Sequence, residues 1–197
     1  MFQLRYYRRV AEDRTDASPR RRELARRAYE YVSEHGLADL SLRPLADAIG
    51  TSAGVLMFLF GSKDGLVRAI LAEARADELV MLDEVRRATV DADLATVAGN
   101  VWDWLAAPEH ERLLNLWVEA YGRSLITQDG PLAGFAAETV RDWLEMLEAA
   151  DASSDGAHGR ATAVLALLRG SMLDLLATGE RDRVDAAFRL GLRRLLG

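Results

Sequence analysis

Hydrophobic positions recur every three to four residues along most of the chain, which is the spacing of one face of an α-helix. Capping residues, glycines and prolines bound nine such segments. The predicted helices cover about 19–35, 42–49, 63–88, 94–107, 108–126, 135–150, 158–178 and 181–196, and a short helix that contains Leu56, Leu59 and Phe60 lies between the second and third of these ranges. No segment shows sustained alternation of apolar and polar positions with β-branched residues, so the sequence predicts an all-α fold.

Two short predicted helices meet at Gly50. Ser41 is a suitable N-cap for the first helix, and Pro44 falls in its first turn, where a missing N–H has little effect. Gly50 supplies the backbone freedom for a tight turn, and Thr51 or Ser52 can cap the second helix. This arrangement is typical of a helix-turn-helix, and with the preceding helix it makes a three-helix DNA-binding unit.

The stretch IGTSAGVLMFLFGSKDGLV, residues 49–67, resembles the recognition helix of the TetR (tetracycline-repressor-like) family of bacterial transcription regulators. The family pattern is met at Ile49, Gly50, Ser52, Gly54, Leu56, Phe60, Ser62, Lys63 and Asp64. The chain departs from it at Ala53, Val55, Met57 and Leu59, where basic, hydroxyl-bearing or aromatic residues are usual. The specific similarity covers about residues 20–67, and the remainder resembles the family in its layout and its ending.

The resemblance implies a dimeric, ligand-responsive repressor that binds a double-stranded DNA operator and is released by a small apolar or aromatic effector. It also implies an organisation in three parts: a basic N-terminal arm over 1–18, a helix-turn-helix domain over 19–68, and a ligand-binding and dimerisation domain over 69–197. The runner-up interpretation is an all-α ligand-binding or scaffold protein without sequence-specific DNA binding. An enzyme is a distant third.

Charge is distributed unevenly, although the chain as a whole has a net charge of −6. Residues 1–68 carry 12 basic and 9 acidic side chains, whereas residues 69–197 carry 13 and 22. A basic N-terminal third is expected when one end of a protein meets phosphate. The arm is either a solvated tail or a segment that lies along DNA, and the sequence leaves both alternatives open.

The expected DNA contacts fall into two kinds. Phosphate contacts are expected from the exposed cations and the helix cap, and base reading is expected mainly through shape and apolar contact with thymine methyls. The candidate DNA-binding residues are Arg43, Thr51, Ser52, Ala53, Gly54, Val55, Met57, Phe58 and Lys63.

Large aromatic residues concentrate in the second half of the chain. Each one alone is more simply a core residue, but four tryptophans over about forty residues, with a few polar partners, also suit a mostly apolar effector pocket. The candidate ligand-binding residues are Asn100, Trp104, Trp117, Tyr121, Phe135, Thr139, Trp143, Met146 and Arg169.

The last two predicted helices each carry an apolar stripe, and helices in these positions form the dimer interface in the TetR family. The candidate interface residues are Val164, Leu168, Met172, Leu175, Val184, Phe188, Gly191 and Leu195. The alternative is that both stripes face the core of the same chain, and periodicity alone cannot distinguish the two.

Several kinds of chemistry have no support in the sequence. The chain has no cysteine, which excludes disulfides and thiolate chemistry, and it has no zinc-protease, phosphate-loop or dinucleotide motif. We therefore expect no catalytic residues, no metal site and no cofactor. No run of 18 apolar residues and no signal-peptide pattern occurs, so we expect a cytoplasmic protein that does not associate with membranes.

Overall fold

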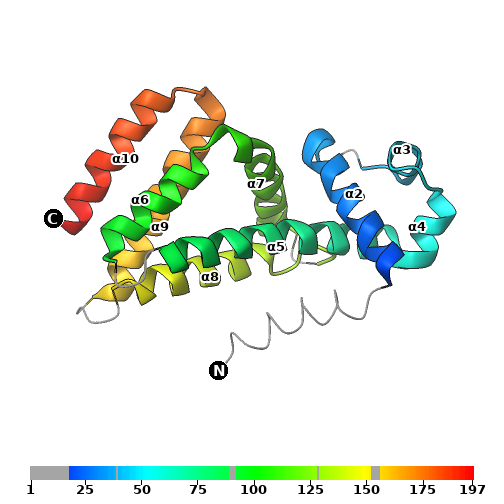
Figure 1. Ribbon diagram of the computed structural model, residues 1–197, viewed down its shortest axis with the longest axis horizontal. Helices are drawn as coiled ribbons and strands as arrows, with labels where there is room; N and C mark the ends of the chain where they lie inside the picture. The colour runs from blue at the N-terminus through cyan, green and yellow to red at the C-terminus, as the bar shows by residue number, and fades with distance from the viewer. Residues whose placement is uncertain (1–17, 39, 89–91, 128, 152–155) are drawn as a thin grey trace. The chain divides into compact units, whose positions relative to one another are not determined.

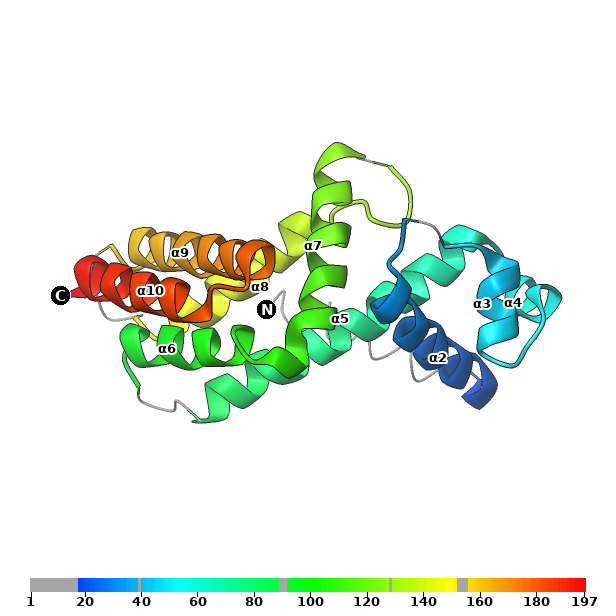
Figure 2. The ribbon, with the colours of Figure 1, turned by 90° about the horizontal axis from the view of Figure 1, so that it is seen from above.

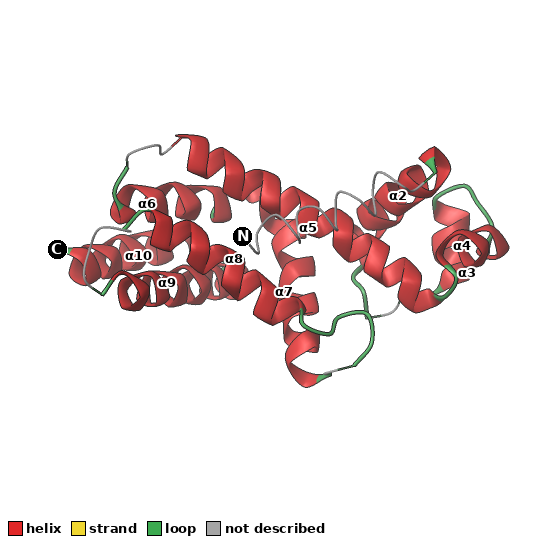
Figure 3. Cartoon of the chain, turned by 90° about the horizontal axis from the view of Figure 1, so that it is seen from below, coloured by secondary structure: helices red, strands yellow, loops and turns green. Residues whose placement is uncertain are grey.

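The computed structural model describes residues 18–38, 40–88, 92–127, 129–151 and 156–197 (Figure 1). All regular structure in these residues is helical (Figure 3). The α-helices are α2 (Pro19–His35), α3 (Leu42–Ala48), α4 (Ala53–Phe60), α5 (Lys63–Ala88), α6 (Leu94–Leu105), α7 (Glu111–Ile126), α8 (Phe135–Ala149), α9 (Ala157–Thr178) and α10 (Arg181–Leu196). The prediction of an all-α fold is thus confirmed. The predicted arm lies outside the described residues, except for Ser18.

The predicted helix ends agree with the observed ones to within two residues, with one exception. The segment predicted as a single helix from Pro108 begins with a separate 3₁₀ turn, η1 (Pro108–His110), and α7 follows it. The capping residues explain the agreement. Ser18, Ser52 and Ser62 each accept a hydrogen bond from the backbone N–H three residues later. Ser41 occupies the N-cap position of α3 but makes no such bond.

The chain forms two compact units. One comprises the described residues up to Leu79 together with Leu116–Ala133, and the other comprises Val80–Asn115 and Gly134–Gly197. The first unit therefore contains the helix-turn-helix and most of α7. This division differs from the expected domain boundary at residue 68, because a segment distant in sequence packs with the N-terminal helices.

Helices α2, α3 and α4 and the start of α5 lie together in the first unit (Figure 2). Their apolar side chains form its core. Gly50 connects α3 and α4 with φ of 70°, a left-handed conformation that favours glycine. Two arginines of α2 bind carbonyl groups at the ends of the next helices: Arg21 Nε donates to Leu59 O at 3.3 Å, and Arg27 Nη1 donates to Ile49 O at 3.2 Å. These bonds satisfy carbonyls that a helix end leaves without partners.

The α2–α3 loop is also bound by α7. The backbone N–H of Leu37 donates to Glu119 Oε2 at 2.8 Å, across 82 positions of sequence. Leu37 is buried, so this carboxylate satisfies an amide that water reaches poorly. The bond joins the loop after α2 to α7 within the first unit.

In the second unit, α6, α8, α9 and α10 pack around a core of large side chains. Helices α9 and α10 lie side by side, with α6 beside them (Figure 2). The indole ring of Trp102 stacks on Phe188 with centroids 4.7 Å apart, and both side chains are completely buried. Leu147, Val164 and Leu168 are fully buried in the same core.

Among the described helices, α9 alone is long and apolar enough to cross a membrane on length and composition, and the bent pair α3–α4 passes the same test if taken as one span. The apolar residues Val164, Leu168 and Met172 of α9 are buried in the core of the second unit. Of the apolar window of α9, 33% is buried inside the chain.

Candidate nucleic-acid interface and effector helices

Helix α4 divides its side chains between the core and the surface. Leu56 and Phe60 are buried, whereas Val55, Met57 and Phe58 are exposed by 38%, 40% and 86%. The helical period explains the division, because positions 56 and 60 lie one turn apart on the inner face. The remaining candidates of this segment, Thr51 and Ala53, are half-buried, and Ser52 and Gly54 are exposed.

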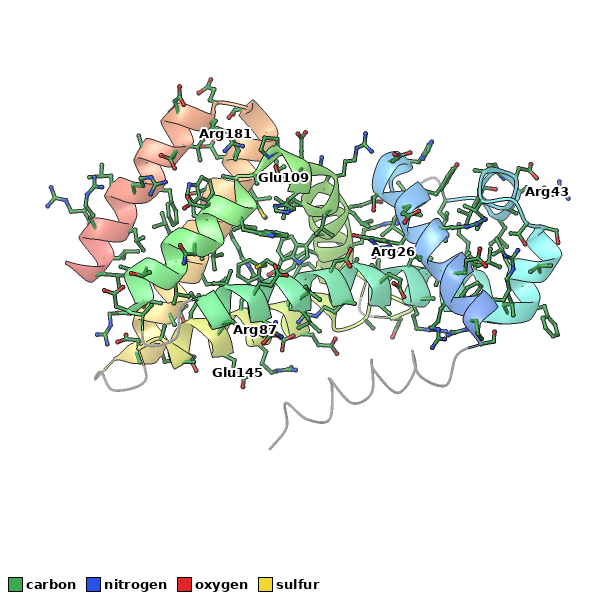
Figure 4. All side chains as sticks on the ribbon, in the orientation of Figure 1. Arg26, Arg43, Arg87, Glu109, Glu145 and Arg181 are labelled. Atoms are coloured by element: carbon green, nitrogen blue, oxygen red, sulfur yellow. The ribbon has the colours of Figure 1, made fainter. Side chains whose placement is uncertain are left out.

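Exposed cations stand on both sides of α4. Arg43 lies on α3 and points away from α2 (Figure 4), and Lys63 is the first residue of α5. Neither makes an ion pair with another residue in the described part of the chain, so both remain available for an external anion. The N-terminus of a long helix such as α5 also favours a phosphate.

Most other cations of this unit are engaged by the protein itself. Arg26 binds Asp77 of α5 at 3.1 Å. Arg20 donates to Glu23 at 2.8 Å, and this hydrogen bond holds the pKa of the Glu23 carboxyl below its ordinary value. Arg20 and Arg26 of α2 are thus paired with carboxylates of the same unit.

The candidate effector residues fall on different helices. Trp117 and Tyr121 stack on α7 with ring centroids 4.7 Å apart, and both are half-buried. Trp104 of α6 stacks on His110 at 3.8 Å, and His110 Nδ1 lies 2.8 Å from Trp104 O. Sequence reasoning did not identify this histidine as a partner of an aromatic ring.

Four candidates lie along one side of α8. Trp143 and Thr139 are buried, and Phe135 and Met146 are half-buried. The Thr139 hydroxyl donates to Ala136 O at 2.9 Å, so its hydrogen is already used within the helix. The remaining polar candidates are Arg169, which is half-buried on α9, and Asn100, which is exposed on α6 and thus not enclosed.

The candidate interface residues divide by their burial within the single chain. Five of the eight are buried within the single chain: Val164, Leu168, Met172, Val184 and Phe188. A side chain without exposed surface has none to bury against a partner, so for these five the alternative of an intrachain core holds. A Cβ placed on Gly191 would lie 3.0 Å from Leu167 Cδ1, so this glycine permits the close approach of α9 and α10 within one chain.

The surface of α9 and α10 carries a different set of apolar side chains. Leu173, Leu190 and Leu195 are exposed by 47%, 52% and 42%, and only the last of them was a sequence candidate. On α9, Leu173 lies in line with exposed small residues at Ala166, Gly170 and Ala177. Leu175 and Gly191 are half-buried.

A polar network at the edge of the second core was also missed. Trp102 Nε1 donates to Asp185 Oδ1 at 2.9 Å, and Arg189 joins Asp185 of α10 to Asp103 of α6 with distances of 3.0 and 3.1 Å. The spacing of Asp185 and Arg189, four residues apart on a helix, is the sequence signal for their pairing. Nothing in the sequence indicates the bond to Trp102.

These elements define an all-α protein with an N-terminal helix-turn-helix. Residues 24–70 match the sequence model of the bacterial regulatory proteins, tetR family. The chain is 37% identical over 54 residues to the HTH-type transcriptional regulator BetI 1 of Chromohalobacter salexigens, an alignment that spans 27% of each chain. It thus covers about a quarter of the length of the curated relatives that it matches.

The fold is similar to solved structures over nearly the whole chain. A TetR-family transcriptional regulator from Rhodococcus sp. superposes with a TM-score of 0.72 at 16% identity, covering 91% of this chain and 100% of the other. The multidrug binding protein EbrR, in complex with proflavin, superposes with a TM-score of 0.67 at 26% identity, covering 90% and 99%. The similarity in sequence to the TetR family thus covers the N-terminal helix-turn-helix, and the matched curated proteins are regulators of transcription.

Proposed function

We propose that the protein is a ligand-responsive transcription regulator, acting as a repressor in the cytoplasm, whose homodimer binds an operator in double-stranded DNA. The observation that carries the proposal is the surface of α4, which is exposed beside two exposed cations, Arg43 and Lys63. Phosphates on either side of a major groove would meet these cations while α4 faces the base edges. The match of residues 24–70 to the tetR family supports the same function.

Selection of DNA fragments from a random library by the purified protein tests this proposal. We expect a sequence with two-fold symmetry whose half-sites are spaced by about one helical turn or a multiple of it. Binding to that sequence should weaken steeply with added salt, because phosphate contacts release counterions. Recovery of no preferred sequence at any salt concentration would favour the alternative, an all-α ligand-binding or scaffold protein.

The phosphate contacts are tested by Lys63→Ala. Affinity should fall for all sequences alike, and the salt slope should decrease by about 1 for each Lys63 that contacts a phosphate. Arg181→Ala is the matched control, since Arg181 is also an exposed cation at the first residue of a helix but belongs to α10. A Lys63 variant that prefers a different sequence with an unchanged salt slope would show that this residue reads bases.

We assign the effector to the stacked pair Trp117 and Tyr121 of α7, in the first unit. The similarity to EbrR, which binds proflavin, favours a flat aromatic compound as the effector. Stacking on such a ring is favourable because offset aromatic pairs attract beyond their buried area. Binding would then shift the protein toward a state with lower affinity for the operator.

Proflavin, malachite green and a set of neutral aromatic compounds are suitable probes. A ligand at 100 times its Kd should stabilise the protein by about 2.7 kcal/mol and change tryptophan fluorescence. Trp117→Ala should abolish both responses, whereas Leu125→Ala, an exposed residue of the same helix, should preserve them. If no compound changes the melting temperature or the fluorescence of a protein that binds DNA, the aromatic residues are core.

The homodimer is proposed to form through the exposed residues of α9 and α10, with Leu173 and Leu190 at the centre of the interface. Two copies of this face would bury the largest exposed apolar side chains of both helices. Leu173→Arg introduces a charge twice in a symmetric interface, so we expect folded monomers by light scattering and loss of operator binding. Leu125→Arg is the control, and a Leu173 variant that remains dimeric would place the interface elsewhere.

A further inference from the structure

We propose that α4 recognises its operator through the C5 methyl groups of pyrimidines in the major groove, with Phe58 as the principal reading side chain. The inference rests on the proposed function, because it presupposes a DNA site. It adds the chemical feature of the base pairs that the helix reads. The ligand class is duplex DNA that carries thymine, or 5-methylcytosine, at the positions facing α4.

The side chains of α4 leave few other ways to read a base. The helix has the sequence AGVLMFLF, and none of these side chains donates or accepts a conventional hydrogen bond. In the major groove each base pair presents hydrogen-bonding atoms, and thymine adds a methyl group. An apolar side chain cannot satisfy the hydrogen-bonding atoms, so the methyl group is the feature that it can recognise.

The polar residue next to the helix is partly used by the helix itself. Ser52 Oγ accepts from the Val55 N–H at 3.2 Å, which orients its hydroxyl toward the first turn. Thr51 is half-buried before the cap. Base-edge hydrogen bonding therefore has little support from the residues that precede α4.

Exposure identifies the reading residue. Phe58 is 86% exposed, about twice as much as Val55 or Met57. Val55 and Phe58 lie three residues apart and share one side of α4, while the exposed Gly54 keeps the first turn narrow enough for close approach. Together with the exposed Val55 and Met57, Phe58 forms a contiguous apolar patch, and such a patch on a soluble protein marks an interaction site.

The positive charges beside α4 favour DNA over a neutral apolar partner. Arg43 and Lys63 lie on the helices before and after α4, and both are exposed. A partner must then be anionic at its edges and apolar between them. A major groove with methyl groups on its floor and phosphates on both sides has this distribution of charge.

The test uses the selected operator with chemically altered bases and measures Kd by fluorescence anisotropy. Each thymine is replaced in turn by deoxyuridine, which removes only the C5 methyl. We expect about a fourfold loss of affinity for each contacted methyl, the effect of withdrawing one buried methylene-sized group from contact. Replacing the same T·A pair by 5-methylcytosine·G should bind several-fold better than C·G, because it restores the methyl.

Variants identify the reading residue. Phe58→Ala should bind the thymine-containing operator more weakly than the wild type does. At the thymine that Phe58 contacts, replacement by deoxyuridine should then cause no further loss of affinity. Lys63→Ala is the matched control, since it should weaken binding while leaving the deoxyuridine effect unchanged. Because Phe58 is mostly exposed, its alanine variant should fold normally, as circular dichroism can verify.

The outcomes separate this inference from the proposed function. A preferred operator whose affinity is unchanged by deoxyuridine at every thymine overturns methyl reading and leaves the DNA-binding proposal intact. The absence of any preferred sequence overturns the proposed function itself. Phe58-dependent binding to vesicles of anionic phospholipid, with no Phe58-dependent DNA binding, would assign the face to a membrane and overturn the inference.

Discussion

The clearest test of the second core is Phe188→Ala. Phe188 has no exposed surface and stacks on Trp102 with centroids 4.7 Å apart. A buried Phe→Ala substitution costs about 3–5 kcal/mol because it leaves a cavity. We expect the upper part of this range, since a lost aromatic pair contributes about 0.5–1.5 kcal/mol beyond area burial.

Such a loss is a large fraction of the roughly 5–15 kcal/mol that stabilises a typical protein. In a chain of this length it corresponds to a melting temperature lower by roughly 8–20 °C. Urea unfolding followed by far-ultraviolet circular dichroism measures the change in free energy. Tryptophan fluorescence reports the region around Trp102, which lies against the altered residue.

The control is Leu125→Ala on α7, outside the proposed dimer interface and 64% exposed. Its effect on the unfolding free energy of the chain should stay within about 0.5 kcal/mol, as for most surface substitutions. The reasoning is refuted if Phe188→Ala unfolds like the wild type but becomes monomeric. In that case Phe188 would contact a partner and not the core of its own chain.

Two further predictions concern polar contacts. Hydrogen bonds from Arg189, and to a lesser extent from Trp102, hold the pKa of Asp185 below its ordinary value of 3.8. The ionised carboxylate therefore stabilises the fold above that pH, and this stabilisation is lost as the pH falls below it. Asp185→Asn should be less stable than wild type at neutral pH, and acid titration of the melting temperature should show the difference shrinking below about pH 4; a constant difference would contradict this. Glu119→Ala leaves the buried Leu37 amide without its acceptor, which should cost about 1–3 kcal/mol. Hydrogen exchange at that amide should accelerate, Glu119→Gln should retain most of the protection, and equal exchange rates in all three proteins would contradict the role of the bond.

The sequence alone was sufficient for the helices and for the helix-turn-helix. Their signals are local: the cap at Ser52 and the turn at Gly50 lie within a few residues of the structure that they determine. The periodicity also placed Leu56 inside and Phe58 outside, because α4 has one clear inner face. The resemblance of residues 49–67 to the TetR family used the same local information.

Only the tertiary structure decided which apolar face of α9 and α10 meets the core. Both helices carry two apolar faces with the same spacing, one through Leu168 and Phe188 and another through Leu173 and Leu190. Periodicity specifies that residues share a face but not which neighbouring helix covers it. The structure buries the first face within the chain and leaves the second exposed.

The same limit applies to contacts between distant segments. The bond from Leu37 to Glu119 joins residues 82 positions apart, and the bond from Trp102 to Asp185 joins residues 83 positions apart. No local pattern encodes such pairs, because each depends on the packing of helices whose order along the chain does not specify their neighbours in space. The sequence therefore determined the helices and the exposed face of α4, while packing determined which side chains of α9 and α10 are buried.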